Sequence, residues 1–277
     1  RTGVSVCLLE KECSLGGLAT VGNVTVWLPI CDGKGRQVIG GIGEELLRLA
    51  VHDLRQTNRA AGFVGVPACW EPGGDPAERQ QTRFTSQFNP AAYILGLELW
   101  VLDAGVKLLY DTRLCAVRRS RGKVTHVIVE NKSGRSAIAC RTAIDATGDA
   151  DLCFLAGEET ESLDCNVGAA WFYYLKEGAV HLHTSSRAFS ANLRRDELKC
   201  PGYRGDDAEQ VTEQVLDSRR LTRDECARLS AKYPETDIQP FALPSIPCFR
   251  ATRRLVGAQS LGERDMHVWF DDAVCLT

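Results

Sequence analysis

Glu10 is the first residue whose type and position could do chemistry. It follows residues 4–9, an almost continuously apolar run that predicts a fully buried strand. An acidic side chain at the end of such a strand can accept hydrogen bonds from the ribose hydroxyls of a dinucleotide. The alternative is a solvated glutamate that ends an ordinary strand. Gly3, directly before the strand, favours the dinucleotide interpretation.

Two glycine-bearing segments could serve the same ligand. Gly16 and Gly17 are paired glycines shortly after the first strand, and such pairs let the backbone approach a ligand closely, although an ordinary flexible turn is the alternative. Residues 143–148 predict a short strand that ends in glycine, at the sheet edge where open α/β sheets bind ligands. Asp149 would cap the helix that we expect over residues 150–156, a role compatible with ligand contact.

A second glycine-rich segment is a weaker phosphate site. Residues 40–43 read GGIG, but Leu46 occupies the position of the last glycine in G-x-G-x-x-G. Glu44 and Glu45 follow directly and would repel a pyrophosphate. We therefore interpret this segment as the entry to a helix over residues 42–56.

The candidates for a catalytic role are Arg253 and Arg254, near Arg250. Guanidinium groups suit the planar geometry of a substrate carboxylate, but surface or ion-paired arginines are the commoner alternative. His181 and His183 would share one face of a strand, and two histidines are too few for a metal site. No metal site is predicted.

The elements that must position these residues alternate between helix and strand. A helix begins at Asn89-Pro90, with the asparagine as its cap, and ends at Gly105. A surface loop is expected at residues 67–76, and a capping box at Thr222 and Glu225. Further strands are expected over residues 106–110 and 167–175, and an antiparallel meander over 113–118, 124–130 and 136–141. We also expect a polar helical region over 206–232 and an ordered element over 251–258.

Composition limits the class of protein. The chain has 277 residues and a net charge of −3, which indicates neither a nucleic-acid partner nor an anionic membrane surface. We see neither a secretory signal nor a stretch that could span a bilayer, and we expect a cytoplasmic protein. The 12 cysteines include no C-x-x-C pair, so they are interpreted as buried, reduced residues.

These segments together resemble the FAD-dependent oxidoreductase family, in which a substrate domain interrupts a Rossmann-like FAD domain. The sequence is similar in fold type to fumarate reductase flavoproteins, and closer to the group named after the A subunit of heterodisulfide reductase. The resemblance rests on VSVCLLEKECSLGGLAT (4–20), DGKGRQVIGGIGEEL (32–46), FNPAAYILGLELWVLDAGVKLLYDT (88–112), GKVTHVIVENKSGRSAIACRTAIDATGDADL (122–152) and RATRRLVG (250–257).

The resemblance implies an α/β fold: an FAD-binding domain over 1–164, an inserted α+β substrate domain over 165–240, and a return to the first domain over 241–277. It also implies cofactor contacts for eight residues. These are Glu10 at the adenosine ribose, Lys11, Gly16 and Gly17 at the pyrophosphate and ribitol, the Leu114 backbone at the adenine, and Thr147, Gly148 and Asp149 closing over the cofactor.

The sequence departs from the family in three ways. The first strand and its Gly-rich loop are missing before Arg1, and the C-terminal FAD segment is missing after Thr277. A [4Fe–4S] cluster occurs in members of the group, but the cysteine spacing here does not support one. We therefore expect an interior portion of a larger flavoprotein that is inactive alone.

The parent protein would transfer hydride or electrons between a small-molecule substrate and an electron donor or acceptor, through FAD. Three alternatives stay open. One is a degenerate Rossmann-like binding module without catalysis. The second is an NAD(P)-binding reductase, because an acidic residue at the ribose does not distinguish the two cofactors. The third is an iron–sulfur protein.

Overall fold

A parallel strand pair leads to the first candidate residue. The computed structural model describes residues 3–52, 65–190 and 194–259. In it, β1 (Cys7–Leu9) pairs with β4 (Lys107–Leu109), and Glu10 follows β1. The prediction of a fully buried strand is wrong, because Val4 is 58% and Val6 48% exposed. Both precede the ladder, and β4 is the one neighbour that β1 has among the described residues.

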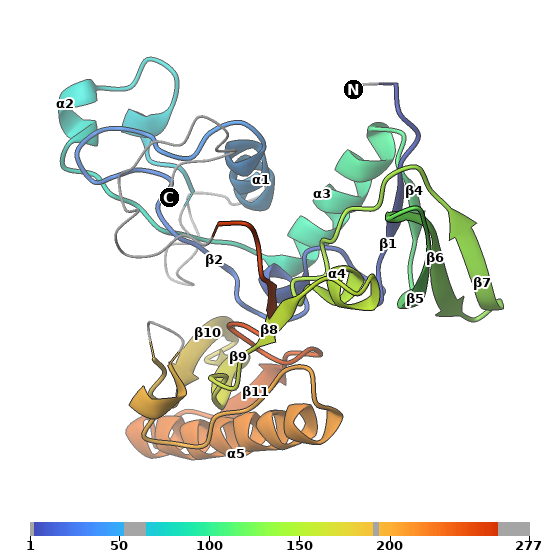
Figure 1. Cartoon of the computed structure of the whole chain (residues 1–277). Coiled ribbons are helices and arrows are strands. Elements are labelled where there is room, and N and C mark those ends of the chain that lie inside the picture. The colour runs from blue at the N-terminus through green and yellow to red at the C-terminus, as the bar shows by residue number, and fades with distance from the viewer. Residues whose placement is uncertain (1–2, 53–64, 191–193, 260–277) are drawn as a thin grey trace.

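One helix packs beside this pair, and a second packs against the first (Figure 1). The longer, α3 (Pro90–Asp103), begins as predicted, since the Asn89 side chain accepts hydrogen bonds from the first free backbone N–H groups. The other, α1 (Ile42–Val51), follows Gly41 as its cap, and residues 53–56 of the predicted helix lie outside the described residues. Apolar side chains join the two helices in one core: Leu15, Ala50, Phe88, Tyr93 and Leu97.

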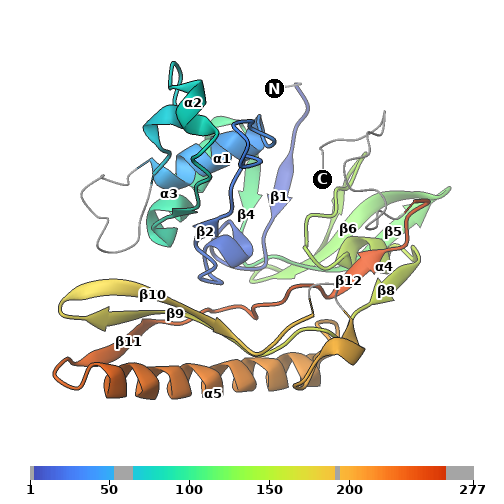
Figure 2. The same cartoon turned by 90° about the vertical axis from the view of Figure 1, so that its left-hand side faces the viewer.

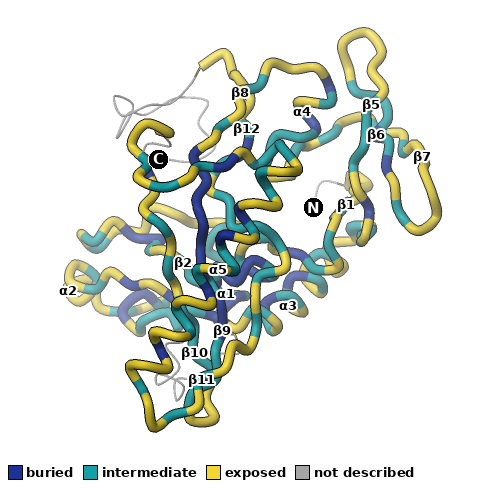
Figure 3. Tube along the Cα trace, turned by 90° about the horizontal axis from the view of Figure 1, so that it is seen from below, coloured by how far each residue is buried: buried dark blue, intermediate teal, exposed yellow. Residues whose placement is uncertain are grey.

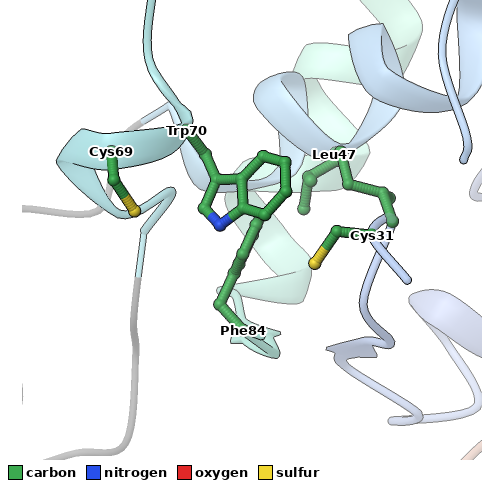
Figure 4. Close-up of a cluster of buried hydrophobic side chains, with 6 residues drawn as sticks. Cys31, Leu47, Cys69, Trp70 and Phe84 are labelled. Carbon is green, nitrogen blue, oxygen red and sulfur yellow. The ribbon is translucent and has the colours of Figure 1, made fainter. Parts of the chain in front are cut away.

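A second core lies where a surface loop was expected. Cys69 and Trp70 are only 2% and 6% exposed, so the surface-loop prediction is wrong at these two residues. The rest of residues 67–76 is exposed or half-buried, as predicted. The Trp70 ring packs against Phe84 (Figure 4), at a centroid distance of 6.1 Å. Its indole N–H donates to the Thr82 carbonyl at 2.7 Å. Burial of a large ring outweighs the loop-forming residues around it. The neighbouring elements are β2 (Val26–Trp27), η3 (Ala68–Trp70), α2 (Pro76–Arg79) and β3 (Ser86–Gln87).

The antiparallel meander is confirmed. It consists of β5 (Arg113–Ser120), β6 (Lys123–Asn131) and β7 (Gly134–Ala139), in that order across the sheet. Residues 143–148, by contrast, do not form the predicted strand, because no ladder partner lies beside them in the described chain. They lead instead to the short helix α4 (Asp151–Leu155).

The second part of the molecule is a three-stranded antiparallel sheet backed by a long helix (Figure 2). The strands are β9 (Ala169–Lys176), β10 (Ala179–Ser186) and β11 (Ile238–Ala242), with β9 in the middle. The helix, α5 (Ala208–Lys232), is capped by Asp207, so the predicted capping box is wrong: Thr222 lies inside the helix. Ala170 and Phe172 of β9 are buried against α5, and the central strand is the most deeply buried of the sheet (Figure 3).

The chain crosses between the two parts twice, and the crossings are bonded to each other. β8 (Thr160–Ser162) pairs antiparallel with β12 (Arg253–Leu255). Beside this pair, Asn166 is fully buried and its side chain bonds backbone groups of Tyr203, Arg250 and Ala251. The domain limits at 164 and 241 stay predictions. Two further short helices are η1 (Gly17–Ala19) and η4 (Arg195–Glu197).

Together these elements form a mixed α/β fold consistent with a Rossmann-like FAD-binding domain. Among the helices described, none combines the length and apolar character needed to cross a membrane.

Candidate functional site

The backbone fixes Glu10 at the carboxyl end of β1. Its N–H donates to the Leu109 carbonyl at 2.9 Å, and its own carbonyl accepts from the Thr112 N–H at 3.0 Å. One carboxylate oxygen, Oε1, accepts a hydrogen bond from the Glu12 N–H at 2.9 Å. Within the described residues, no protein group donates to the second oxygen. Glu10 therefore presents a positioned carboxylate oxygen that is available to a hydroxyl donor.

A pocket of about 380 Å³ begins next to Glu10, at Lys11. Strand alternation explains its floor: Arg113 and Cys115 line the pocket, while Leu114, between them, turns its side chain into the core. The remaining lining residues are Asp111, Glu130, Asn131 and Lys132. The backbone around Leu114 thus borders a polar pocket that two strands of the meander hold open.

Gly16 and Gly17 have different reasons to be glycine. Both have positive φ, of 100° and 51°. A Cβ on Gly16 would lie 2.6 Å from the Thr20 side chain, so packing alone requires glycine there. A Cβ on Gly17 would meet nothing within 4 Å. The space beside Gly17 is therefore open, as a site of close ligand approach requires.

The turn after residue 146 is held by its own side chains. Thr147 Oγ1 donates to Asp145 at 2.7 Å and accepts from the N–H groups of Asp149 and Asp151 at 3.2 and 3.1 Å. The sequence predicted that Asp149 caps the following helix, and this prediction is wrong. The cap position belongs to Ala150, at φ 53°. The Thr147 hydroxyl accepts hydrogen bonds from the two N–H groups just before and at the start of this helix, which would otherwise lack a partner.

Asp145 is a residue that the sequence reasoning missed. Its carboxylate also accepts from the Thr147 N–H at 3.0 Å and from the Cys153 N–H at 3.0 Å. Burial disfavours the charged form, but these bonds prevail and hold the pKa of Asp145 below its ordinary value. The D-x-T spacing was the available signal, since aspartate commonly bonds the backbone two residues on. Gly148, at φ 80°, has open space where a Cβ would be.

One apolar cluster brings these segments together. Leu9 precedes Glu10, Leu114 borders the pocket, and Leu152 follows the 145–151 turn; all three pack in one cluster with Val127 and Val129. Residues far apart in the sequence thus meet at the carboxyl end of β1. An electrostatic interaction between Lys11 and Asp151 spans the same region.

The two candidate arginines already have protein partners. Arg253 is 8% exposed in its side chain and lies 3.0 Å from Asp151 Oδ1 and 3.6 Å from Asp206 Oδ2. Arg254 is 60% exposed and pairs with Glu161 at 2.5 Å. These contacts favour the ion-paired alternative, and a substrate clamp stays a prediction. The sequence gives no local signal for Arg253, because its partners lie far away in the chain.

The histidines face α5 instead of the candidate site. His183 Nε2 lies 3.2 Å from Glu225 Oε2, and both side chains are mostly buried. The parts of the chain that the structure describes contain no group of three or more His, Cys, Asp or Glu side chains arranged to hold a metal ion.

Comparison with known proteins yields a family match over the first part of the chain. The model of a family described as "FAD dependent oxidoreductase" matches residues 1–169. No curated protein sequence matches.

Solved structures similar to the chain include AlpK, at 17% identity, covering 61% of this chain and 33% of AlpK, with a TM-score of 0.36. BexE is 14% identical, with coverage of 64% and 38% and a TM-score of 0.35. CabE, an aromatic hydroxylase from angucycline biosynthesis, is 17% identical, with coverage of 62% and 36% and a TM-score of 0.32. The chain thus spans between 33% and 38% of the length of these structures.

Proposed function

Because the chain belongs to the FAD-dependent oxidoreductase family, we propose that Glu10, Lys11, Gly17 and the turn 147–149 hold an FAD cofactor. The observation that carries the proposal is the clustering of the Glu10 strand end and the 147–149 turn around Leu9, Leu114 and Leu152, at the carboxyl end of one parallel strand. Open α/β sheets bind nucleotides at such an edge.

The residues present fit the cofactor. Glu10 has a free carboxylate oxygen for ribose hydroxyls, and Gly17 and Gly148 leave open space where a side chain would stand. Lys11 supplies a positive charge beside the pocket, which suits a pyrophosphate. Gly16 contributes through packing, and the Leu114 backbone borders the space that we assign to the adenine. Thr147 and Asp145 keep the turn in place.

When bound, the flavin ring accepts and donates hydride or single electrons. The protein binds and orients it. We propose that the inserted part, with its sheet and α5, supplies the site for a small-molecule substrate, and that a separate electron donor or acceptor completes the reaction. We also propose that the chain is similar to the heterodisulfide reductase A group and that the protein is cytoplasmic. We do not propose an iron–sulfur cluster.

Purification with chromatographic identification of any released cofactor tests the proposal and separates FAD from NAD(P). We expect flavin absorbance and released FAD. Glu10→Gln should weaken FAD binding by about tenfold, because it replaces a charged acceptor bond of about 1.5–3 kcal/mol with a neutral one of about 1 kcal/mol. Glu45→Gln, an exposed carboxylate in the first turn of α1, is the matched control. A colourless protein that does not quench FAD fluorescence would refute the proposal.

A further inference from the structure

We propose that Arg253 is a positioning residue that fastens the turn 147–151 to the inserted part and neutralises the carboxylates around that turn. The proposal rests on the proposed function, and it places the turn on the pyrophosphate side of the FAD site because Asp151 interacts with Lys11. It gives Arg253 a different task from the substrate clamp suggested by the sequence.

The guanidinium of Arg253 is held on the side of α4 by three groups. Nη1 lies 3.0 Å from Asp151 Oδ1 and 3.4 Å from the Asp149 carbonyl oxygen. The flat face of the guanidinium stacks over the Phe154 ring, with its carbon 4.2 Å from the ring centroid. Arg253 thus contacts the backbone of the turn directly, in addition to the helix that follows it.

On the other side, Arg253 reaches the segment that leads into α5. Nη2 lies 3.6 Å from Asp206 Oδ2, and the Asp206 side chain is 6% exposed. Asp206 is itself fixed by Arg204 at 3.0 Å and by the Ser162 hydroxyl at 2.5 Å. One side of the guanidinium is therefore held by a carboxylate of the inserted part. Its other side holds the turn 147–151.

The charges explain why an arginine is needed here. The Asp151 and Asp206 carboxylates lie against one buried guanidinium, and Asp149 contacts it through its carbonyl oxygen. Lys11 is a second cation that interacts with Asp151. Burial and the neighbouring Asp149 raise the pKa of Asp151, as expected of crowded carboxylates. Removing Arg253 would leave the Asp151 and Asp206 carboxylates without this cation, beside the site that we assign to a doubly charged pyrophosphate, and like charges repel each other.

The direction of the bonds also matters. A guanidinium can donate from several N–H groups in one plane, so it can bond Asp151, the Asp149 carbonyl and Asp206 together, which a lysine ammonium cannot do at the same reach. Arg253→Lys should therefore restore part of the electrostatic effect and little of the hold on the turn.

Fluorescence titrations with FAD and with riboflavin, which lacks phosphate, test the proposal on the full chain. We expect Arg253→Ala to weaken FAD binding by about tenfold, or about 1.4 kcal/mol, while riboflavin binding changes less than about twofold. Adding Asp151→Asn to Arg253→Ala should recover part of the FAD affinity, because one carboxylate loses its charge. Arg228→Ala, an exposed ion-paired arginine on α5, controls for a change in net charge.

Equal losses for FAD and riboflavin, or no loss for either, would overturn the proposal. Amide hydrogen exchange of residues 149–154 in the unliganded chain gives a second measurement. Arg253→Ala should raise exchange there and Arg228→Ala should not; unchanged exchange would also overturn it. If the wild-type chain binds neither flavin, the proposed function fails, and the exchange measurement alone decides whether Arg253 holds the turn.

Discussion

Asn166→Ala should be among the most destabilising single substitutions in the chain. The Asn166 side chain is fully buried and makes four hydrogen bonds to backbone. Its N–H₂ group donates to the carbonyls of Tyr203 at 3.1 Å and Ala251 at 2.6 Å, and its oxygen accepts from the N–H groups of Arg250 at 2.8 Å and Ala251 at 3.1 Å. Alanine would leave all four backbone groups without these partners.

The magnitude follows from these four bonds. Each hydrogen bond contributes about 1 kcal/mol net, and an orphaned buried group costs about 1–3 kcal/mol. Entry of water into the vacated space reduces the sum, so we expect a loss of about 3–5 kcal/mol in the free energy of unfolding. For a chain of this size that corresponds to a fall in Tm of about 10 °C.

Urea unfolding followed by circular dichroism measures this loss. Asn131→Ala is the control, since Asn131 is only half-buried and its side chain makes two hydrogen bonds, at 3.2 and 2.9 Å. Asn166→Asp sharpens the test: a carboxylate cannot donate to the two carbonyls, so this variant should gain stability as falling pH protonates it. A loss of under about 1 kcal/mol for Asn166→Ala would refute the reasoning.

Two further predictions concern a backbone conformation and a titration. Gly148→Ala places a side chain at φ 80° and should cost about 1–2 kcal/mol in urea unfolding, with weaker FAD binding because the open space is filled. His183 is largely buried, and burial holds its pKa below the usual value despite the nearby Glu225. The unfolded chain therefore binds more protons, so stability should fall as pH drops below about 6.5; His183→Gln should flatten that dependence in urea unfolding from about pH 5 to 8.

Each of these two predictions has an outcome that would contradict it. A Gly148→Ala variant as stable as wild type would mean that the turn relaxes to another conformation. A wild-type chain whose stability did not change across that pH range would mean that His183 is as solvated in the folded state as in the unfolded one.

The sequence predicted the elements whose ends are determined by nearby turn and capping residues. The meander follows from two short turns between alternating strands, and α3 follows from an asparagine cap, Pro90 and Gly105. Trp70 was missed because its burial depends on Phe84 and Thr82, outside the loop-like segment. Nothing in residues 143–148 shows that a ladder partner is lacking.

The residues of the candidate site also differ in whether the sequence could predict them. Glu10 and the glycines could be proposed from position along the chain, because a strand end and a positive φ have sequence signatures. The contacts of Arg253 with Asp151 and Asp206 could not, since they join segments that only the folded chain brings together. Asp145 lies between these cases: its spacing to Thr147 is a local signature.

The paired crossings bring the two ends of the inserted part together. The Leu163 N–H donates to the Thr252 carbonyl at 2.9 Å, and β8 and β12 run side by side. A segment whose two ends already touch can be exchanged, shortened or lost in evolution while the host strands keep their positions, because a short linker bridges the gap. This junction would let the host scaffold exchange its inserted part without being rebuilt.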